Sequence, residues 1–259
     1  MPQYHTSVCN HPTLSPYIEG YLQLTGPGHP SFKYVQPRPG AAILFDFKGL
    51  TFNECTPLNL ALAGLHTRPY AFRTLTEDRD AFIIKFSPYG LSRWIDTPAS
   101  GLTDRITDAA DFFGKDIQEL YSSINGLDFR DRIQAAEAFF AKRMHTAPNH
   151  LENCIFKIAD DIRRNGHFSF DRLRKAVPAS KRHLERRFKD IIGTSMTTYS
   201  RICKFEQVQQ LLSAKTESLT SIAYEAGYFD PAHFSKDYKR ISSVRPKNYS
   251  ACLLPSKTI

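Results

Sequence analysis

The sequence predicts an α+β chain of two parts. An antiparallel sheet or small β-barrel with trailing helices comes first, and an all-helical part with a tandem helix-turn-helix follows. Three observations predict this fold class. Short apolar or alternating runs fill the first eighty-odd residues, with no long helical pattern between them. Helical periodicity dominates from residue 87 onward. Within the last hundred residues, one pattern occurs twice, displaced by fifty positions.

The length and the charge distribution divide the chain. Its 259 residues allow two ordinary domains, and the turn at Pro148 predicts one at 1–146 and another at 150–252. Residues 1–150 hold 14 Lys and Arg against 15 Asp and Glu, whereas residues 151–259 hold 20 against 11. The excess positive charge therefore belongs to the second part, which is expected to attract a polyanion such as nucleic acid.

The cysteine pattern and the apolar runs narrow the class of protein further. The five cysteines are widely spaced and form no CxxC pair, so neither a zinc cluster nor a disulfide framework is indicated. The N-terminus has no signal-peptide pattern, and no apolar run approaches the length of a membrane span. We expect a reduced, cytoplasmic protein that needs no membrane, no metal and no cofactor.

In the first part, short runs separated by Gly, Pro and acidic turns predict strands. These runs are Phe32–Gln36, Ala41–Phe47, Leu58–Leu65 and Ala81–Phe86. Ser87 followed by Pro88 predicts an N-cap and a helix that continues to Trp94. Further helices are expected at Lys115–Ile124 and Phe129–Met144. The apolar stripe of the last one fits either a homodimer interface or a cap over the sheet.

In the second part, capping residues and apolar periodicity predict a series of helices. They are expected at Leu151–Arg164, in a short segment after Ser169, after Ser180, at Thr197–Leu212, at Leu219–Ala226 behind Ser218, and after Asp230. The helix at 197–212 has a wide apolar face, which predicts that it is buried between two units. The two helix-turn-helix units then span 169–190 and 218–240.

The repeat places equivalent residues on two helices. Each copy begins with a cap residue and continues with an apolar stripe, Ser180, Leu184, Phe188, Ile191 and Tyr199 in the first and Asp230, Phe234, Tyr238, Ile241 and Tyr249 in the second. The opposite faces carry Arg182, Glu185, Arg186 and Lys189 in one copy and Ala232, Ser235, Lys236 and Lys239 in the other. Because these spacings are i, i+3, i+4 and i+7, each set lines one side of its helix. Two mostly basic faces in matching register predict two probes for neighbouring DNA grooves.

Residues 150–250 strongly resemble the AraC/XylS family of bacterial transcription regulators. The segments that carry the resemblance are SKRHLERRFK at 180–189, Ile222-Ala223, GYFDPAHFSKDYKR at 227–240 and RPKNY at 245–249. The resemblance implies a DNA-binding domain of about seven helices, whose two recognition helices enter successive major grooves. The sequence departs from the family pattern at Arg174, Pro178, Ser243 and Arg245.

The resemblance also implies roles for individual residues. It implies base contacts by Arg182, Glu185, Arg186, Ala232, Ser235 and Lys236. Phosphate contacts are expected from Ser180, Lys181, Lys189, His233 and Lys239, since lysine is better suited to phosphate. Arginine has the planar fork that matches guanine O6 and N7, so Arg182 or Arg186 is expected to read a base directly. Glu185 either accepts from cytosine N4 or pairs with Lys189 four residues on. His183 and His233 are expected to pack or to contact phosphate rather than to bind metal.

The first part is similar to an uncharacterised subgroup of such regulators, which implies an effector-sensing or dimerising domain. His66, Arg68 and Tyr70 either line an effector pocket or are ordinary strand-end residues. The partners implied are double-stranded DNA, a small-molecule effector, a second copy of the chain and RNA polymerase. We expect no enzyme, because no catalytic constellation is present. A non-specific nucleic-acid-binding architectural protein and an enzyme fused to a DNA-binding module are the alternatives.

Overall fold

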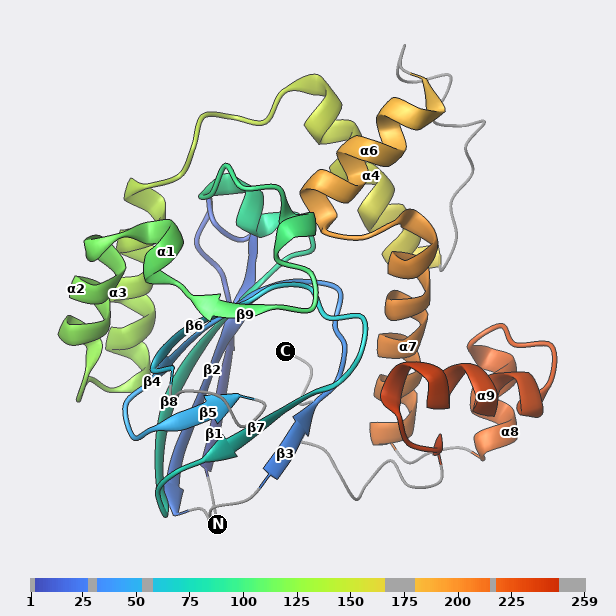
Figure 1. Ribbon diagram of the computed structural model, residues 1–259, viewed down its shortest axis with the longest axis horizontal. Coiled ribbons are helices and arrows are strands. Elements are labelled where there is room, and N and C mark those ends of the chain that lie inside the picture. Colours follow the sequence, from blue (N-terminus) through green and yellow to red (C-terminus); the bar gives the residue numbers. More distant parts are fainter. Residues whose placement is uncertain (1–2, 28–31, 53–57, 166–179, 215–217, 247–259) are drawn as a thin grey trace.

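The computed structural model describes residues 3–27, 32–52, 58–165, 180–214 and 218–246. The first part contains two antiparallel sheets (Figure 1). The larger sheet has the order β1 (Gln3–Val8), β2 (Ile18–Pro27), β8 (Asp78–Phe86), β4 (Ala42–Asp46), β6 (Leu60–Ala63) and β9 (Ile106–Asp108). The smaller sheet has the order β3 (Phe32–Val35), β7 (Tyr70–Thr74) and β5 (Leu50–Phe52). The described strands form no closed barrel, so the sheet alternative is confirmed and the barrel is not found.

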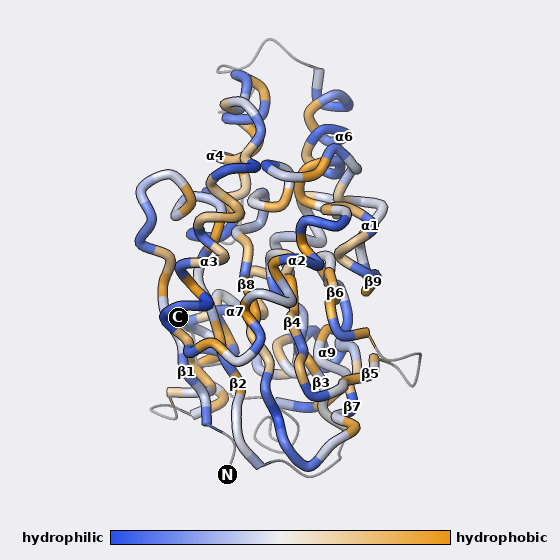
Figure 2. Tube along the Cα trace, turned by 90° about the vertical axis from the view of Figure 1, so that its left-hand side faces the viewer, coloured by the Kyte–Doolittle hydropathy of each residue, from blue (hydrophilic) through white to orange (hydrophobic). Residues whose placement is uncertain are grey.

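Alternating burial explains why these segments are strands. Phe82, Ile84 and Phe86 of β8 are completely buried in the main core, and they alternate with less buried neighbours. Figure 2 shows hydrophobic and hydrophilic residues interleaved along the strands and helices. Each of the four predicted runs contains a strand, although β8 begins three residues earlier than expected. Strands β1, β2, β5, β7 and β9 were not predicted.

The prediction of a helix from Ser87 to Trp94 is wrong. That segment makes only a short 3₁₀ turn, Gly90–Arg93, and Ser87 does not cap it. The Ser87 amide donates instead to the carbonyl oxygen of Tyr17 at 2.9 Å. A Cβ atom at Gly90 would lie 2.0 Å from the same oxygen. Close packing of this turn against the Tyr17 backbone therefore overrides the local helix signal.

Three helices cover one side of the larger sheet (Figure 1): α1 (Ala110–Phe113), α2 (Lys115–Ile124) and α3 (Phe129–Lys142). The predictions for α2 and α3 are confirmed to within two residues. Ala136, Phe139 and Phe140 of α3 are buried in the sheet core. The indole nitrogen of Trp94 donates to the Phe140 carbonyl oxygen at 2.9 Å. The apolar stripe of α3 thus caps the sheet, which is the second of its two predicted uses.

The second part is helical, with α4 (His150–Asn165), α6 (Lys181–Ile192), α7 (Met196–Ala214), α8 (Leu219–Glu225) and α9 (Pro231–Ser242). The predicted N-caps are confirmed by side-chain hydrogen bonds, in which Ser180, Ser218 and Asp230 accept from the amide three residues on. The short helix expected after Ser169 lies outside the described residues, as do Arg174, Pro178 and Tyr249.

Helix α7 runs from the neighbourhood of α4 and α6 to that of α8 and α9 (Figure 1), and it takes part in two separate cores. Its first half contributes Tyr199 and Ile202 to a core with α4 and α6, and its second half contributes Phe205 and Val208 to a core with α8 and α9. The prediction that this helix is buried between two units is confirmed. The relative positions of the core with α4 and α6 and of the core with α8 and α9 are therefore set by one continuous helix.

The first prediction concerns a buried carboxyl at the end of β4. Burial raises the pKa of the Asp46 carboxyl to about 6. A raised carboxyl pKa contributes stability that is complete below the unfolded value and is lost as the pH rises through about 6. Asp46→Asn keeps an acceptor for the Gly49 amide, which lies 2.7 Å from Oδ2. At pH 7.5 we expect this variant to be more stable than the parent by on the order of 2 kcal/mol.

Urea unfolding at pH 4.5, 5.5 and 7.5 measures this effect. The advantage of Asp46→Asn should shrink as the pH falls. Asp78→Asn, which changes a carboxyl whose side chain is 61% exposed, is the control for the loss of a surface carboxylate. A constant difference between Asp46→Asn and the parent at all three pH values would contradict the explanation.

Candidate nucleic-acid interface

Helix α6 has one face in the core and one face in solvent. The Ser180 hydroxyl accepts from the His183 amide at 3.3 Å and starts the helix. Leu184 and Phe188 are buried against α4 and α7. The opposite side presents the exposed side chains Arg182, Glu185, Arg186 and Lys189. The separation of the two faces follows from the 3.6-residue period.

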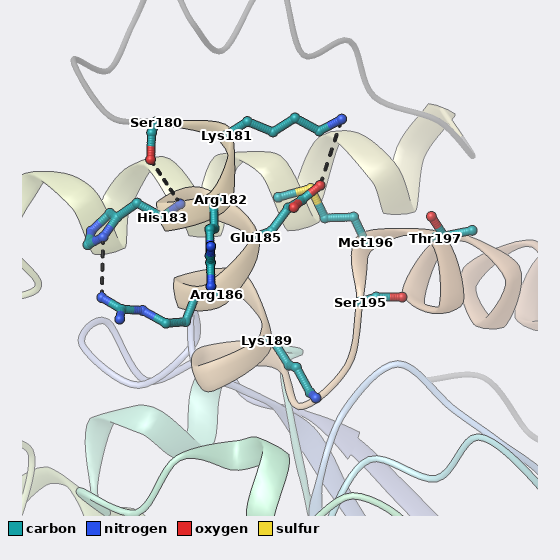
Figure 3. A pocket seen from close by; sticks show the side chains of 10 residues that line it. All are labelled: Ser180, Lys181, Arg182, His183, Glu185, Arg186, Lys189, Ser195, Met196 and Thr197. Atoms are coloured by element: carbon teal, nitrogen blue, oxygen red, sulfur yellow. Dashed lines mark hydrogen bonds and ion pairs between the residues drawn. The ribbon is translucent and has the colours of Figure 1, made fainter.

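The exposed face of α6 borders an open surface hollow (Figure 3). It is lined by Ser180, Lys181, Arg182, His183, Glu185, Arg186, Lys189, Ser195, Met196 and Thr197. All six residues predicted on the first recognition helix are therefore brought together. Three further lining residues, Ser195, Met196 and Thr197, were missed. The available signal was the Ser195 cap, whose hydroxyl accepts from the Thr198 amide at 3.2 Å at the start of α7.

The contacts within the hollow are weak and local. Arg186 lies 3.4 Å from Nδ1 of His183, and Lys181 lies 3.9 Å from Glu185 (Figure 3). Glu185 therefore pairs with the lysine four residues before it rather than with Lys189, the partner considered from the sequence. Such exposed pairs hold their side chains only slightly. The side chains of Arg182, Glu185, Arg186 and Lys189 are exposed, so a ligand can reach them from solvent.

The neighbouring arginine Arg187 has a different environment. Its guanidinium lies 3.6 Å from Glu152 of α4 and 3.9 Å from Asp190. These contacts turn Arg187 toward the core side of the helix, whereas Arg186 stays exposed. Two adjacent arginines thus have separate uses, one inside the domain and one at its surface.

Helix α9 repeats the arrangement. Asp230 accepts from the His233 amide at 2.7 Å, and Pro231 occupies the first turn. Phe234 and Tyr238 are buried in the second core. The exposed residues of the other side are Ala232, His233, Ser235, Lys236, Lys239 and Arg240. A second surface hollow is lined by His233, Lys236, Asp237, Lys239 and Arg240, so Ala232 and Ser235 lie outside the set that lines it.

Helix α9 ends in an unusual conformation. Ser243 stands where the resembled family has glycine, and it adopts the left-handed region with φ of 63°. Its amide donates to the Lys239 carbonyl oxygen at 2.9 Å. A side chain is strained in this region, yet the hydrogen bond closes the helix as a glycine would. The departure from the family pattern therefore leaves the C-terminal end of α9 intact.

The candidate effector residues of the first part are only partly assembled. The His66 ring is buried, and its Nδ1 lies 2.8 Å from the Gly64 carbonyl oxygen. Burial lowers the pKa of this imidazole. The His66 and Tyr70 rings lie 4.3 Å apart, whereas Arg68 is exposed. Among the described residues, no group of three His, Cys, Asp or Glu side chains is placed to hold a metal ion.

Helix α4 and the end of α6 are docked on the first part of the chain. The Tyr89 and Phe156 rings stack at 4.1 Å, and the Tyr89 hydroxyl donates to Asp160. Arg163 of α4 forms an ion pair with Glu19 of β2. At the C-terminal end of α6, the Thr103 hydroxyl donates to the Gly193 carbonyl oxygen at 2.5 Å. The domain that carries the first exposed face is thus held by aromatic, ionic and backbone contacts.

Glu19 is the shared acid of this contact, and it generates the second prediction. It accepts from Arg38 at 2.6 Å and also pairs with Arg163. Glu19→Ala leaves two partly buried guanidinium groups without this acid. We expect a loss of about 1–2 kcal/mol in the free energy of unfolding, measured with urea. Lys48→Ala, which removes an exposed ion pair with Asp78, should cost less than about 0.5 kcal/mol. Equal losses for the two variants would contradict this account.

Comparisons with known proteins agree with this geometry. Residues 173–251 match the family described as a helix-turn-helix domain, and residues 7–108 match a domain of unknown function (DUF6597). A curated relative, the HTH-type transcriptional regulator GlxA of Rhizobium meliloti (strain 1021), is 37% identical over 67 residues, which are 26% of this chain and 21% of that protein. The match thus covers about a fifth of the relative's length.

Solved structures resemble the chain more distantly. Apo ToxT from Vibrio cholerae strain SCE256 is 12% identical with a TM-score of 0.48, over 90% of this chain and 98% of that one. The unsaturated-fatty-acid-bound wild-type ToxT of that strain is 14% identical with the same TM-score, over 90% and 95%. None of the described helices is long and apolar enough to cross a membrane. The capped helices α6 and α9 both lie within the segment that matches the helix-turn-helix domain family.

Proposed function

We propose that this protein regulates transcription by binding specific DNA sequences through α6 and α9. One observation carries the proposal: two capped helices each bury an apolar stripe and expose a mostly basic face, and one continuous helix joins their cores. A single basic helical face is commonly just solvated surface. Two such faces on a shared support favour a ligand with two equivalent, negatively charged sites.

The dimensions support duplex DNA as that ligand. Helix α7 has 19 residues, which corresponds to a length of about 28 Å. Successive major-groove entries lie about 34 Å apart. The two recognition helices pack with opposite halves of α7, and the widths of the units that it joins bring the remaining distance within reach. A helical connector also keeps the spacing nearly constant, which favours two sites at a fixed separation.

The side chains divide by chemistry into base readers and phosphate contacts. Arg182 and Arg186 can form paired hydrogen bonds with guanine O6 and N7. Glu185 can leave its weak pair with Lys181, which lies at 3.9 Å, and accept from cytosine N4. Base contacts on the second helix are assigned to Ala232, Ser235 and Lys236. Phosphate contacts are assigned to Ser180, Lys181, Lys189, His233 and Lys239.

Control is assigned to residues 1–146, with a ligand or a second copy of the chain as the signal. The docking contacts support this assignment, because Glu19 and Thr103 join that part directly to α4 and to the end of α6. A ligand that moved β2 or the turn around Thr103 would also move α6, which carries the first exposed basic face. His66 and Tyr70, whose rings touch, are the candidate effector residues, with Arg68 beside them in sequence.

Selection of bound duplexes from a random pool, using the full chain, tests the proposal. We expect recovery of two short conserved blocks separated by about one helical turn of DNA. Footprinting on genomic DNA then locates the natural sites. Recovery of duplexes without a common sequence would overturn sequence-specific regulation and would favour the non-specific architectural alternative.

Arg186→Ala gives the third prediction. Loss of a bidentate guanine contact should cost about 1–3 kcal/mol on the selected site and much less on random DNA. Titration by fluorescence anisotropy on both duplexes at one salt concentration measures the difference. Lys142→Ala, which removes an exposed charge at the end of α3, is the matched control and should leave both affinities unchanged. An equal loss on both duplexes for Arg186→Ala would show a phosphate contact instead.

A further inference from the structure

One aromatic side chain next to α9 is not packed against the rest of the fold. Phe229 is 92% exposed, more than any other large hydrophobic residue that the structure describes. It directly precedes Asp230, the N-cap of α9. An exposed phenyl ring gains about 1.5–3 kcal/mol when it is removed from water. A ring this exposed is therefore suited to a surface that becomes covered on binding.

The fold does not use Phe229 where a residue at its position would normally pack. The residue before an N-cap commonly contacts the fourth residue of the helix, which is Phe234. Phe234 is already buried, with its ring 5.4 Å from Tyr228 and 6.0 Å from Tyr238. Tyr228 thus occupies the place that a packed Phe229 would fill, and the Phe229 ring projects into solvent.

The surroundings favour DNA as the occupant. The N-terminal residues of a recognition helix are those that approach the base edges, and Phe229 lies at that end of α9. Lys236, Lys239 and Arg240 are exposed on the same helix. Two acids of α9 and its cap are engaged, since Asp230 caps the helix and Asp237 accepts from the Tyr228 hydroxyl at 3.0 Å. An apolar tip followed by exposed basic groups matches a groove bordered by phosphates.

We propose that Phe229, together with the exposed Ala232, contacts the methyl groups of thymine, and that Phe229 thereby determines part of the sequence specificity. This inference rests on the proposed DNA-binding function. The C5-methyl of thymine is the apolar group that base edges present in the major groove, and alanine and phenylalanine are residues that contact it. Helix α6 then selects guanine through arginine, and the start of α9 selects thymine through apolar contact. The predicted site is asymmetric.

Deoxyuridine tests this directly, because it lacks only the methyl group. Each thymine of the selected site is replaced in turn, and affinity is measured for the full-length protein. At one or two positions we expect the affinity to fall about fourfold, the equivalent of one buried methyl. In Phe229→Ala, the affinity for the thymine site should already be reduced, and the replacement of the thymine that Phe229 contacts should have no further effect. A thymine contacted by Ala232 should keep its effect in this variant.

Tyr224→Ala is the matched control, because Tyr224 is also an exposed aromatic residue of this unit, at 58%. It should keep the full effect of deoxyuridine. Circular dichroism and thermal unfolding should show that Phe229→Ala folds as the parent does, since its ring is in solvent. The loss of the deoxyuridine effect in Phe229→Ala, and its retention in Tyr224→Ala, is our fourth prediction.

The contrary outcomes are distinct. If the parent binds its site specifically but deoxyuridine has no effect, or has equal effects in the parent and in Phe229→Ala at every position, the thymine contact of Phe229 is overturned while sequence-specific DNA binding stands. If Phe229→Ala binds DNA normally but loses transcriptional control, the ring serves a protein partner and the inference is again overturned. If the parent has no sequence preference, the proposed function fails, and this inference fails with it.

Discussion

The sharing of α7 between two cores is the constraint on which the rest of the structure depends. Tyr199 and Ile202 bury their side chains with α4 and α6, and Phe205 and Val208 bury theirs with α8 and α9. Burial of such side chains stabilises each unit by several kcal/mol. Neither unit can therefore turn about the connector without exposing apolar surface. The separation and relative orientation of the two exposed faces follow from this burial rather than from any contact between the faces.

The two units differ in what else holds them. Leu65 and Tyr89 from the first part of the chain join the core of the first unit, and Arg163 pairs with both Glu19 and Glu206. The core of the second unit is formed, among the described residues, by α7, α8, α9 and the segments next to them. A displacement in the first part reaches α6 directly through these contacts. Among the described residues, the core that holds α9 is joined to the rest of the chain through α7.

Features that depend on neighbouring residues could be predicted from the sequence, and features that depend on distant ones could not. The caps at Ser180 and Asp230 and the buried stripes behind them follow from spacing within one helix. The turn at Gly90 depends on the backbone of Tyr17, and the docking pair joins Glu19 to Arg163, 144 positions away. The sequence favoured sheet or barrel equally, because strand pairing across the edges is not a local property.

The candidate site has the same division between local and distant effects. Residue type and helical period show that Arg186 and Arg187 are adjacent on the helix. They do not show which of the two arginines pairs with acids inside the domain. Arg187 is engaged because Glu152 of another helix happens to face it. Phe229 is exposed because Tyr228 fills the position beside Phe234. In both cases the neighbouring residue makes the contact inside the fold, and the other residue stays exposed and available to a ligand. A basic or aromatic side chain therefore indicates an interface only when other residues of the fold do not pair with it or bury it.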